Sequence, residues 1–594
     1  MQNSLKIKAA TPAFKLADPV FNADLMISTI ATAENDGVNV LVFPELCSCG
    51  FTCGVLFNQE FFLEKCYEQT YRIIASTKGK DLLVVFGAPL VRESYNVAFA
   101  VQNGKILSIT PKTNLSAAFS EADNFFPYEG EKRRKFSIYD QKVPFGQSAF
   151  SVTLANSPIS VSVEIGTDDY CNDSADLSIN IAAIPTRIGG ESEVDGWFKN
   201  RSGACLFVNA GLYESTANGV FGGEKAFYVN GEKRACEPAF SEKDLTVELS
   251  FPVENKPCFD VDDEPAISKE PFIPSNEKEK ENLAEFVLNA AGHALAARME
   301  RSRAKTAVIG VSGGLDSTIA LLIVDRAFEI LEKDKKDIIA ITMPGFGTTG
   351  KTKNNSHVLM NEIGATVKEI DITPSVSQHF KDIGHSENDY SVAYENSQAR
   401  MRTMILMDVA NETGGLVVGT GDLSEIALGW STYNGDHMSM YAVNCGLPKT
   451  LIRYLVEQIS QKSTGERARV LKEVYEQEIS PELLPPSKNG EIAQKTESLI
   501  GPYELHDFFL YYFAKEGRSP YEVMQWATVL FEEYSPEEIK KWATVFFRRF
   551  TTQQFKRSCS PDGAAIGQIN LSPKVWKMPA DLDPSVFLND LEEL

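Results

Sequence analysis

Cysteine and histidine are both scarce in this chain, with ten and six residues among 594. The ten cysteines are scattered, without a CxxC pair of zinc-site spacing or a disulfide-dense framework. Cys47, Cys49 and Cys53 are interpreted as buried free thiols, with a metal cluster as the alternative. The six histidines all lie at or beyond His293. Histidine chemistry is therefore excluded from the chain before that residue.

Long apolar runs and positive charge are also lacking. No stretch approaches the ~18 consecutive apolar residues of a membrane span, and the first residues contain no apolar signal segment. We therefore expect a cytoplasmic protein with no membrane partner. The net charge of −23 argues against a nucleic-acid partner, which favours a basic surface. The length of 594 residues allows two large domains.

Two common nucleotide-binding patterns are missing as well. The first half shows no GxGxxG, and the glycine turn of the second half lacks the GK[ST] of a Walker loop. The second half instead has TAVIGVSGGLDST at 306–318, which predicts a strand, a glycine turn and a helix opening near Asp316. Glycines allow close backbone approach, and N–H groups at a helix start suit a phosphate. Asp316 beside an anion indicates a Mg²⁺ between them.

The remainder of the second half alternates strands and helices, which predicts a parallel, doubly wound sheet. Ligands bind at the carboxyl ends of such strands, where SGGLDS, residues 344–347 and GTGDLSE all fall. Glu425 is expected to complete a Mg²⁺ site with Asp316. Asp422 is a weaker candidate that is expected to cap a helix. Lys449 is suited to a phosphate or an adenylate, or else is a solvated surface lysine.

The first half mixes apolar strands, helical segments and two hairpins. Both NVAFAVQNGKILSIT and KAFYVNGEKRACE turn at Asn-Gly, a strong hairpin signal. This mixture favours a layered α/β sandwich. Proline and charge are dense between the two halves. We therefore predict a first domain at 1–245, a linker at 246–280 and a second domain at 281–594.

The second half resembles NAD⁺ synthetase. The resemblance rests on SGGLDST, MPGFGTT, YENSQAR, GTGDLSE, WSTYNGD, LPKTLIR and QQFKRSCSPDG. It implies a ligase that adenylates the nicotinate carboxylate of deamido-NAD⁺ with ATP and Mg²⁺, after which ammonia displaces AMP. Mg²⁺ ligands are implied at Asp316 and Glu425, with Asp436 and Lys449 at the reacting phosphate.

The resemblance also assigns the substrate contacts. The implied ATP contacts are Gly310, Val311, Ser312, Gly313, Gly314, Leu315, Asp316, Ser317 and Thr420. The implied deamido-NAD⁺ contacts are Asn396, Glu425, Trp430, Ser431, Thr432, Tyr433 and Lys556. The family usually assembles, so a homo-oligomer is expected.

The first half resembles a nitrilase-type amidase, the glutaminase half of glutamine-dependent NAD⁺ synthetases, with an α-β-β-α sandwich fold. LVFPELCSCGFT places Glu45 at the family's catalytic glutamate, and ITPKTNL places Lys112 at its lysine. At the position of the nucleophilic cysteine, VEIGTDDY has Gly166. The amidase site is therefore expected to be degenerate, with Glu45 and Lys112 as a structural pair.

Positions near this site also depart from the family. Thr167 replaces a glutamate, Tyr170 a tryptophan and Ala118 an aromatic residue. Ser120 replaces a second glutamate, with Glu121 one place out of register. The polar residues that hold glutamine in relatives fall on Ile184 and Gly190.

These departures predict that free ammonia, not glutamine, is the nitrogen donor. One alternative is a glutamine-dependent enzyme with a rearranged site that uses Cys171. The others are a carbon–nitrogen hydrolase with a nucleotide-sensing domain, and a sensor without turnover.

Overall fold

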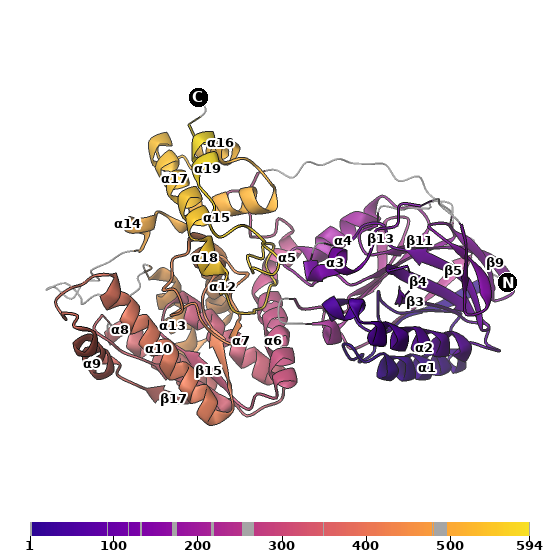
Figure 1. The fold of residues 1–594 in the computed structure, drawn as a ribbon, viewed down its shortest axis with the longest axis horizontal. Helices are drawn as coiled ribbons and strands as arrows, with labels where there is room; N and C mark the ends of the chain where they lie inside the picture. Colours follow the sequence, from indigo (N-terminus) through magenta and orange to yellow (C-terminus); the bar gives the residue numbers. More distant parts are fainter. Residues whose placement is uncertain are drawn as a thin grey trace. The chain divides into compact units, whose positions relative to one another are not determined.

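A computed structural model describes residues 3–91, 93–116, 118–130, 134–168, 175–215, 219–251, 253, 267–347, 350–477, 479 and 496–592. The chain divides into two compact units between residues 264 and 265 (Figure 1). The short segment 187–189 is counted with the second unit.

The first unit contains two β-sheets. The strands of one sheet follow the order β14-β1-β2-β3-β4-β5-β7-β6, and those of the other β13-β12-β11-β10-β9-β8. The first sheet is built from β1 (Asn3–Ala9), β2 (Val40–Val42), β3 (Leu83–Leu90), β4 (Tyr95–Gln102), β5 (Lys105–Pro111), β6 (Arg134–Ile138), β7 (Gln141–Phe145) and β14 (Leu245–Phe251). The second is built from β8 (Phe150–Leu154), β9 (Ser157–Ile165), β10 (Leu177–Ala182), β11 (Ala204–Asn209), β12 (Lys225–Val229) and β13 (Glu232–Glu237).

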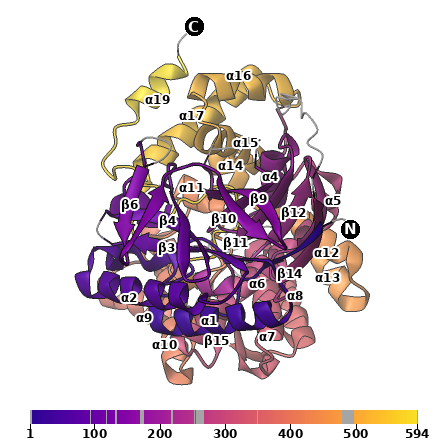
Figure 2. The same ribbon diagram turned by 90° about the vertical axis from the view of Figure 1, so that its right-hand side faces the viewer.

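Each sheet has an inner face and a helix-covered face. Apolar side chains of both sheets, such as Val85 and Ile179, share one buried cluster. Met26 and Ile30 of α1 pack with Phe86 on the outer face of the first sheet, while Phe198 of α4 packs with Phe207 on the second. The layers can be followed in Figure 2. This is the predicted α-β-β-α sandwich, which is thereby confirmed.

The described helices of this unit range in length from 4 to 17 residues. They are α1 (Pro19–Asn35), α2 (Glu60–Ser76), α3 (Glu121–Asn124) and α4 (Gly190–Lys199), with 3₁₀ turns η1 (Phe51–Asn58), η2 (Ala118–Ser120) and η3 (Leu212–Glu214).

The Asn-Gly hairpins form as predicted, because β4 pairs with β5 and β12 with β13 in antiparallel register. The predicted linker begins too early, since Leu245–Phe251 pairs along β1 as strand β14. Its alternation of apolar and polar residues fits an edge strand.

The second unit is built on a parallel sheet of order β17-β16-β15-β18-β19. Its strands are β15 (Ala307–Gly310), β16 (Ile338–Thr342), β17 (Thr366–Glu369), β18 (Leu416–Gly419) and β19 (Tyr441–Ala442), all paired in parallel. The chain winds outward in one direction from β15 to β17, then returns to β18 on the other side. The predicted doubly wound sheet is confirmed, and its crevice lies between the ends of β15 and β18.

Helices surround this sheet and extend beyond it toward the C-terminus. They are α5 (Glu277–Glu281), α6 (Leu283–Ser302), α7 (Leu315–Ile330), α8 (Gly350–Ile363), α9 (Thr373–Ile383), α10 (Val392–Thr413), α11 (Leu423–Leu428), α12 (Lys449–Lys462), α13 (Gly465–Glu476), α14 (Thr496–Ile500), α15 (Tyr503–Leu510), α16 (Pro520–Leu530), α17 (Pro536–Thr552), α18 (Gln554–Arg557) and α19 (Ser585–Asp590), with a 3₁₀ turn η4 (Lys335–Asp337) and a π-helical turn η5 (Tyr511–Lys515). Within the described residues, no helix is both long and apolar enough to cross a membrane.

Candidate functional site

The glycine loop after β15 is closed by its own serines. Gly313 has φ of 89°, a left-handed conformation that glycine adopts without strain. The Ser317 hydroxyl accepts hydrogen bonds from the N–H groups of Ser312 and Gly313, at 3.2 and 3.3 Å. Helix α7 then begins at Leu315. The loop is thus held as a turn whose backbone faces the start of a helix, the geometry that suits a phosphate.

A second loop, after β18, is attached to the first. The Asn444 side-chain amide donates to the carbonyl oxygens of Asp316, at 2.9 Å, and Thr420, at 3.0 Å. Asp422 caps α11 by accepting from the Glu425 N–H at 2.9 Å, as predicted. Sequence reasoning missed Asn444, because nothing local to that residue indicates a link between two distant loops.

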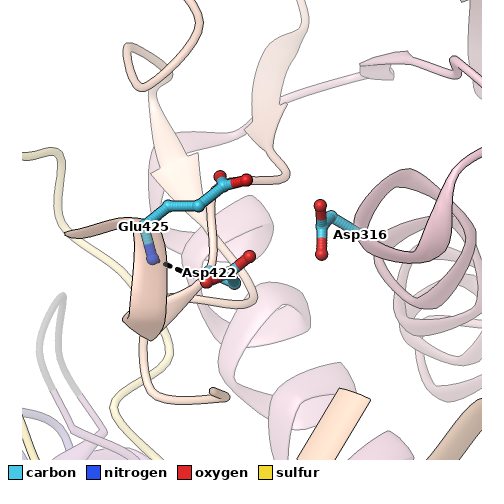
Figure 3. A group of neighbouring side chains, drawn as sticks. All are labelled: Asp316, Asp422 and Glu425. Atoms are coloured by element: carbon cyan, nitrogen blue, oxygen red, sulfur yellow. Dashed lines mark hydrogen bonds between the residues drawn. The ribbon is translucent and has the colours of Figure 1, made fainter. Parts of the chain in front are cut away.

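Three carboxylates converge where these loops meet. Oxygen atoms of Asp316, Asp422 and Glu425 all lie within 4.8 Å of one another. Figure 3 shows that Asp316 projects from the start of α7 toward the two carboxylates of the β18–α11 segment. The two predicted metal ligands are thus brought together, and Asp422 joins them in addition to capping a helix.

The ammonium of Lys449 lies among these carboxylates. Its Nζ is 2.7 Å from Asp316, 2.5 Å from Asp422 and 3.1 Å from Glu425. Lys449 is 2% exposed, so the alternative of a solvated surface lysine is wrong. Its position at the start of α12 follows from Pro448, which ends the extended approach to that helix.

Burial and mutual charge set the protonation of this cluster. Burial alone lowers the pKa of Lys449, but the three carboxylates raise it well above its usual value. Burial raises the pKa of Glu425 to about 7, although Lys449 opposes this shift. Burial likewise raises the pKa of Asp422. Once all three acids are ionised, they carry more negative charge than one ammonium balances, and a divalent cation would balance the remainder.

A second observation also indicates that these carboxylates could bind Mg²⁺. Oδ1 of Asp316 is buried without a hydrogen-bond partner among the described residues. An orphaned carboxylate oxygen beside other carboxylates is suited to a hard cation.

Asp507 holds the cluster in place from behind. Its carboxylate accepts from the Ser424 hydroxyl, and from the Thr450 N–H and hydroxyl at 3.0 and 2.7 Å. Ser424 also accepts from the Lys449 N–H at 2.8 Å. Burial raises the pKa of Asp507 to about 6. Asp507 thereby joins α11 to α12. In the sequence this role is marked by no more than an acid in the apolar stretch YELHDFFL.

A large cavity opens beside the cluster. Its volume is about 350 Å³. It is lined by many of the predicted site residues: Gly310, Val311, Ser312, Gly314, Leu315, Asp316, Ser317, Thr420, Glu425, Trp430, Ser431, Asp436 and Lys449. Gly313, Asn396, Thr432, Tyr433 and Lys556 do not line it.

Several of the residues outside the cavity wall shape the segment 429–437. The Thr432 hydroxyl donates to Asn396 at 2.7 Å, and its N–H donates to Asp436 at 2.7 Å. Lys556 donates to the carbonyls of Gly429 and Ser431, both at 2.8 Å.

An aromatic contact adds to this support. The Arg549 guanidinium lies 5.1 Å from the ring centre of Trp430. It also donates to the Leu428 carbonyl at 3.0 Å, which fixes the guanidinium at the start of the same segment.

The first unit contains a second buried lysine cluster. Lys112 Nζ donates to Glu45 at 2.7 Å and to Glu121 at 3.0 Å. Glu45 also accepts from Asn96 at 2.6 Å and from the Ala183 N–H at 2.9 Å. Burial raises the pKa of Glu45 to about 7. Burial opposes the charge of Lys112, but the two glutamates raise its pKa above the usual value.

Glu121 corrects one expectation from the sequence. It was expected to be out of register, yet its carboxylate reaches Lys112 and the Ser116 N–H, the latter at 2.8 Å. Phe119 and Ser120 both have left-handed backbone, with φ of 56° and 59°. This tight turn shifts the chain so that the later residue faces the cluster.

Gly166 faces the same cluster. A Cβ atom on Gly166 would lie 3.3 Å from both Cε and Nζ of Lys112 and 3.5 Å from Glu45 Oε2. Its φ is 60°, and its carbonyl accepts from the Asn180 amide at 3.0 Å. A side chain at this position would therefore point at the Glu–Lys pair. Tyr170, Cys171 and the side chain of Ala118 lie outside the described residues.

The cysteines behave as the thiol interpretation predicts. Cys47, Cys49 and Cys53 are buried and free. In the described part of the chain they form no group with metal-binding spacing.

Comparison with known proteins identifies the class of this site. The family model described as NAD synthase matches residues 287–558, which contain the glycine loop and the carboxylate cluster. This part of the chain is therefore a domain of the NAD synthase class.

Matches over the whole chain are more specific. Glutamine-dependent NAD(+) synthetase of Mycobacterium leprae is 31% identical over 669 residues, covering 100% of this chain and 98% of the relative. Its Mycobacterium tuberculosis counterpart, strain H37Rv, is 31% identical over 99% of this chain and 98% of its own. The chain belongs to the glutamine-dependent NAD(+) synthetase family.

The fold agrees with this assignment. A crystal structure of a glutamine-dependent NAD(+) synthetase from Cytophaga hutchinsonii superposes with a TM-score of 0.77 at 21% identity, covering 99% of this chain and 100% of the other.

Proposed function

We propose that this chain converts deamido-NAD⁺ to NAD⁺ with ATP, and that free ammonia supplies the nitrogen. The single observation that carries the choice of donor is Gly166. Amide hydrolysis through an acyl-enzyme needs a nucleophile beside its base. The position that points at Glu45 and Lys112 has no side chain.

The synthetase site supports the first step of this proposal. The 310–317 loop and Thr420 would hold ATP, with its phosphates near the start of α7. Asp316 and Glu425 would hold Mg²⁺, which when bound supplies charge neutralisation at the phosphates. A nicotinate carboxylate oxygen attacks the α-phosphorus, the acyl-adenylate forms and pyrophosphate leaves.

In the second step the leaving group is the phosphate of AMP, which departs as an anion and needs no protonation by a side chain. Ammonia adds to the acyl carbon, AMP leaves and the added nitrogen loses a proton. Lys449 lines the same cavity as the 310–317 loop, so its charge would lie beside the developing anion in both steps. Asn396, Asp436 and Lys556 hold the segment that contains Trp430, Ser431, Thr432 and Tyr433, where the deamido-NAD⁺ would bind.

The curated relatives are named glutamine-dependent, and the proposal departs from that name at the amidase-like unit. An intact Glu45–Lys112–Glu121 cluster is what favours the rival, a glutamine-using enzyme with a relocated nucleophile.

The test measures NAD⁺ and glutamate together, with ammonium chloride or glutamine as the only donor. We expect turnover with ammonium and only background glutamate with glutamine. Cys171→Ala is the informative variant. Glutamate release that matches NAD⁺ formation, and that this variant loses, would establish the rival.

A further inference from the structure

The second unit holds a cysteine and a histidine in contact, apart from the carboxylate cluster. Cys559 Sγ lies 3.3 Å from Nε2 of His437, and the two residues are 122 positions apart in the chain. Cys559 follows α18, whereas His437 ends the segment 429–437. The contact therefore joins the C-terminal region to the segment beside the cavity.

The hydrogen bonds of His437 determine which ring nitrogen faces the thiol. Nδ1 lies 2.9 Å from the carbonyl oxygen of Thr432, which only accepts, so Nδ1 carries the proton. In the neutral ring, Nε2 is then an acceptor directed at Cys559. A histidine nitrogen within reach of a thiol can take its proton and leave the more nucleophilic thiolate.

The pair is open to small molecules. Cys559 is partly exposed, unlike the buried thiols of Cys47, Cys49 and Cys205. His437 lines the cavity of about 350 Å³. His437 also lines a small cavity of about 30 Å³, together with Cys445 and Ser560.

We propose that Cys559 is a modification site for small-molecule disulfides. His437 takes the thiol proton, and the Cys559 sulfur attacks one sulfur of the disulfide. A protein mixed disulfide forms, the original S–S bond breaks, and the leaving thiolate takes the proton from His437. The exchange needs no further oxidant and is reversed by a thiol.

Modification should lower synthetase activity. The Cys559 thiol has a second acceptor besides His437, because it also donates to the Lys556 carbonyl at 3.3 Å. Lys556 in turn holds the carbonyls of Gly429 and Ser431, which begin the segment around Trp430. A group attached to Cys559 replaces the thiol proton that His437 and the Lys556 carbonyl share, and we expect the loss of these contacts to shift that segment.

Cystamine on the full-length protein is the probe, followed by peptide mass spectrometry over time. Exposed Cys236 is the internal reference thiol. We expect Cys559 to be modified about tenfold faster than Cys236, and His437→Gln to remove this advantage while Cys236 keeps its rate. Faster modification of Cys236, or an unchanged Cys559 rate in His437→Gln, would overturn the activation by histidine.

Activity with ammonium provides the second measurement. Cystamine should remove most of the activity of the wild type and of the matched control Cys236→Ser, and a reducing agent should restore it. Cys559→Ser should keep its activity in cystamine. Equal inhibition of Cys559→Ser, or complete modification of Cys559 without loss of activity, would contradict the proposal.

Discussion

Both units of this protein bury a lysine against carboxylates, yet the two clusters differ in what lies beside them. Lys112 contacts Glu45 and Glu121, and Lys449 contacts Asp316, Asp422 and Glu425. Both lysines have a raised pKa because their acidic neighbours outweigh burial. In protonation and packing the clusters are similar.

Their surroundings separate them. Lys449 borders a cavity of about 350 Å³, whereas a cavity of about 10 Å³ that Glu45 lines includes neither Lys112 nor Gly166. The Lys112 cluster faces Gly166, whereas the Lys449 cluster contains the Asp316 oxygen that lacks a hydrogen-bond partner among the described residues. A buried lysine with acids is thus insufficient evidence of activity. Space for a substrate and an atom that can react or ligate must accompany it.

Asp316→Asn should have the largest effect. It keeps the size of the side chain but removes a charge that the proposal assigns to Mg²⁺ and Lys449. We expect pyrophosphate release to fall by about 10³-fold. The exposed Asp408→Asn on α10 is the control and should retain activity. Normal pyrophosphate release in the Asp316 variant would remove this residue from the mechanism.

Asp507→Asn should have the next largest effect. The new amide N–H group faces the hydroxyl groups of Ser424 and Thr450, which now donate to the carboxylate. This loss of acceptors loosens the α11–α12 junction beside Lys449. We expect kcat to fall by about tenfold to a hundredfold, because displacements near 1 Å cost that much. Steady-state kinetics on Glu504→Gln, an exposed change on the same helix, give the reference. Equal kcat values for both variants would contradict a positioning role.

Gly166→Cys should create a pH-dependent thiol in the first unit. Burial raises the pKa of Glu45 to about 7, so this carboxylate is protonated below pH 7 and accepts the thiol proton only above it. Iodoacetamide labelling should therefore rise about tenfold per pH unit up to about 7 and then level off.

The control for this variant is Gly166→Ser, which carries the same backbone strain and should not be labelled at that residue. Glutamine hydrolysis should stay near background in both variants, since positions such as Ile184 and Gly190 also depart from the glutamine-binding pattern. Labelling of Gly166→Cys that begins to rise only above pH 8 would show that Glu45 does not serve as the base.

Glu45→Gln should have the smallest effect. Lys112 retains Glu121 as a partner, so the fold is expected to persist. Under the ammonia proposal, NAD⁺ formation from ammonium should stay within about twofold of wild type. A loss specific to glutamine-driven turnover would instead reveal a working amidase.

Local pattern was sufficient for the fold and for the loops of the synthetase site. The carboxyl ends of parallel strands lie along one edge of a sheet, so the pattern of strands predicted that the turns after β15 and β18 are neighbours. Asp422 was correctly expected to cap a helix, because an acid before an apolar helical run satisfies free N–H groups.

Contacts between distant segments were beyond that reasoning. Asn444 and Asp507 act on loops many residues away, and neither sits in a distinctive pattern. Glu121 was misplaced because counting along the chain ignores left-handed turns such as Phe119–Ser120. The predicted linker at 246–280 started within strand β14, because an edge strand can resemble a connecting segment in composition.

Lys449, which lies among three acids, also affects the stability of the folded protein when neither metal nor nucleotide is bound. An acidic pocket that relied on a metal for charge balance would repel itself whenever nucleotide and cation were scarce. Lys449 acts as a built-in counter-ion that is covalently tethered and cannot be washed away. Dialysis against a chelator should therefore leave the protein folded, because Lys449 balances part of the acidic charge when no metal is bound.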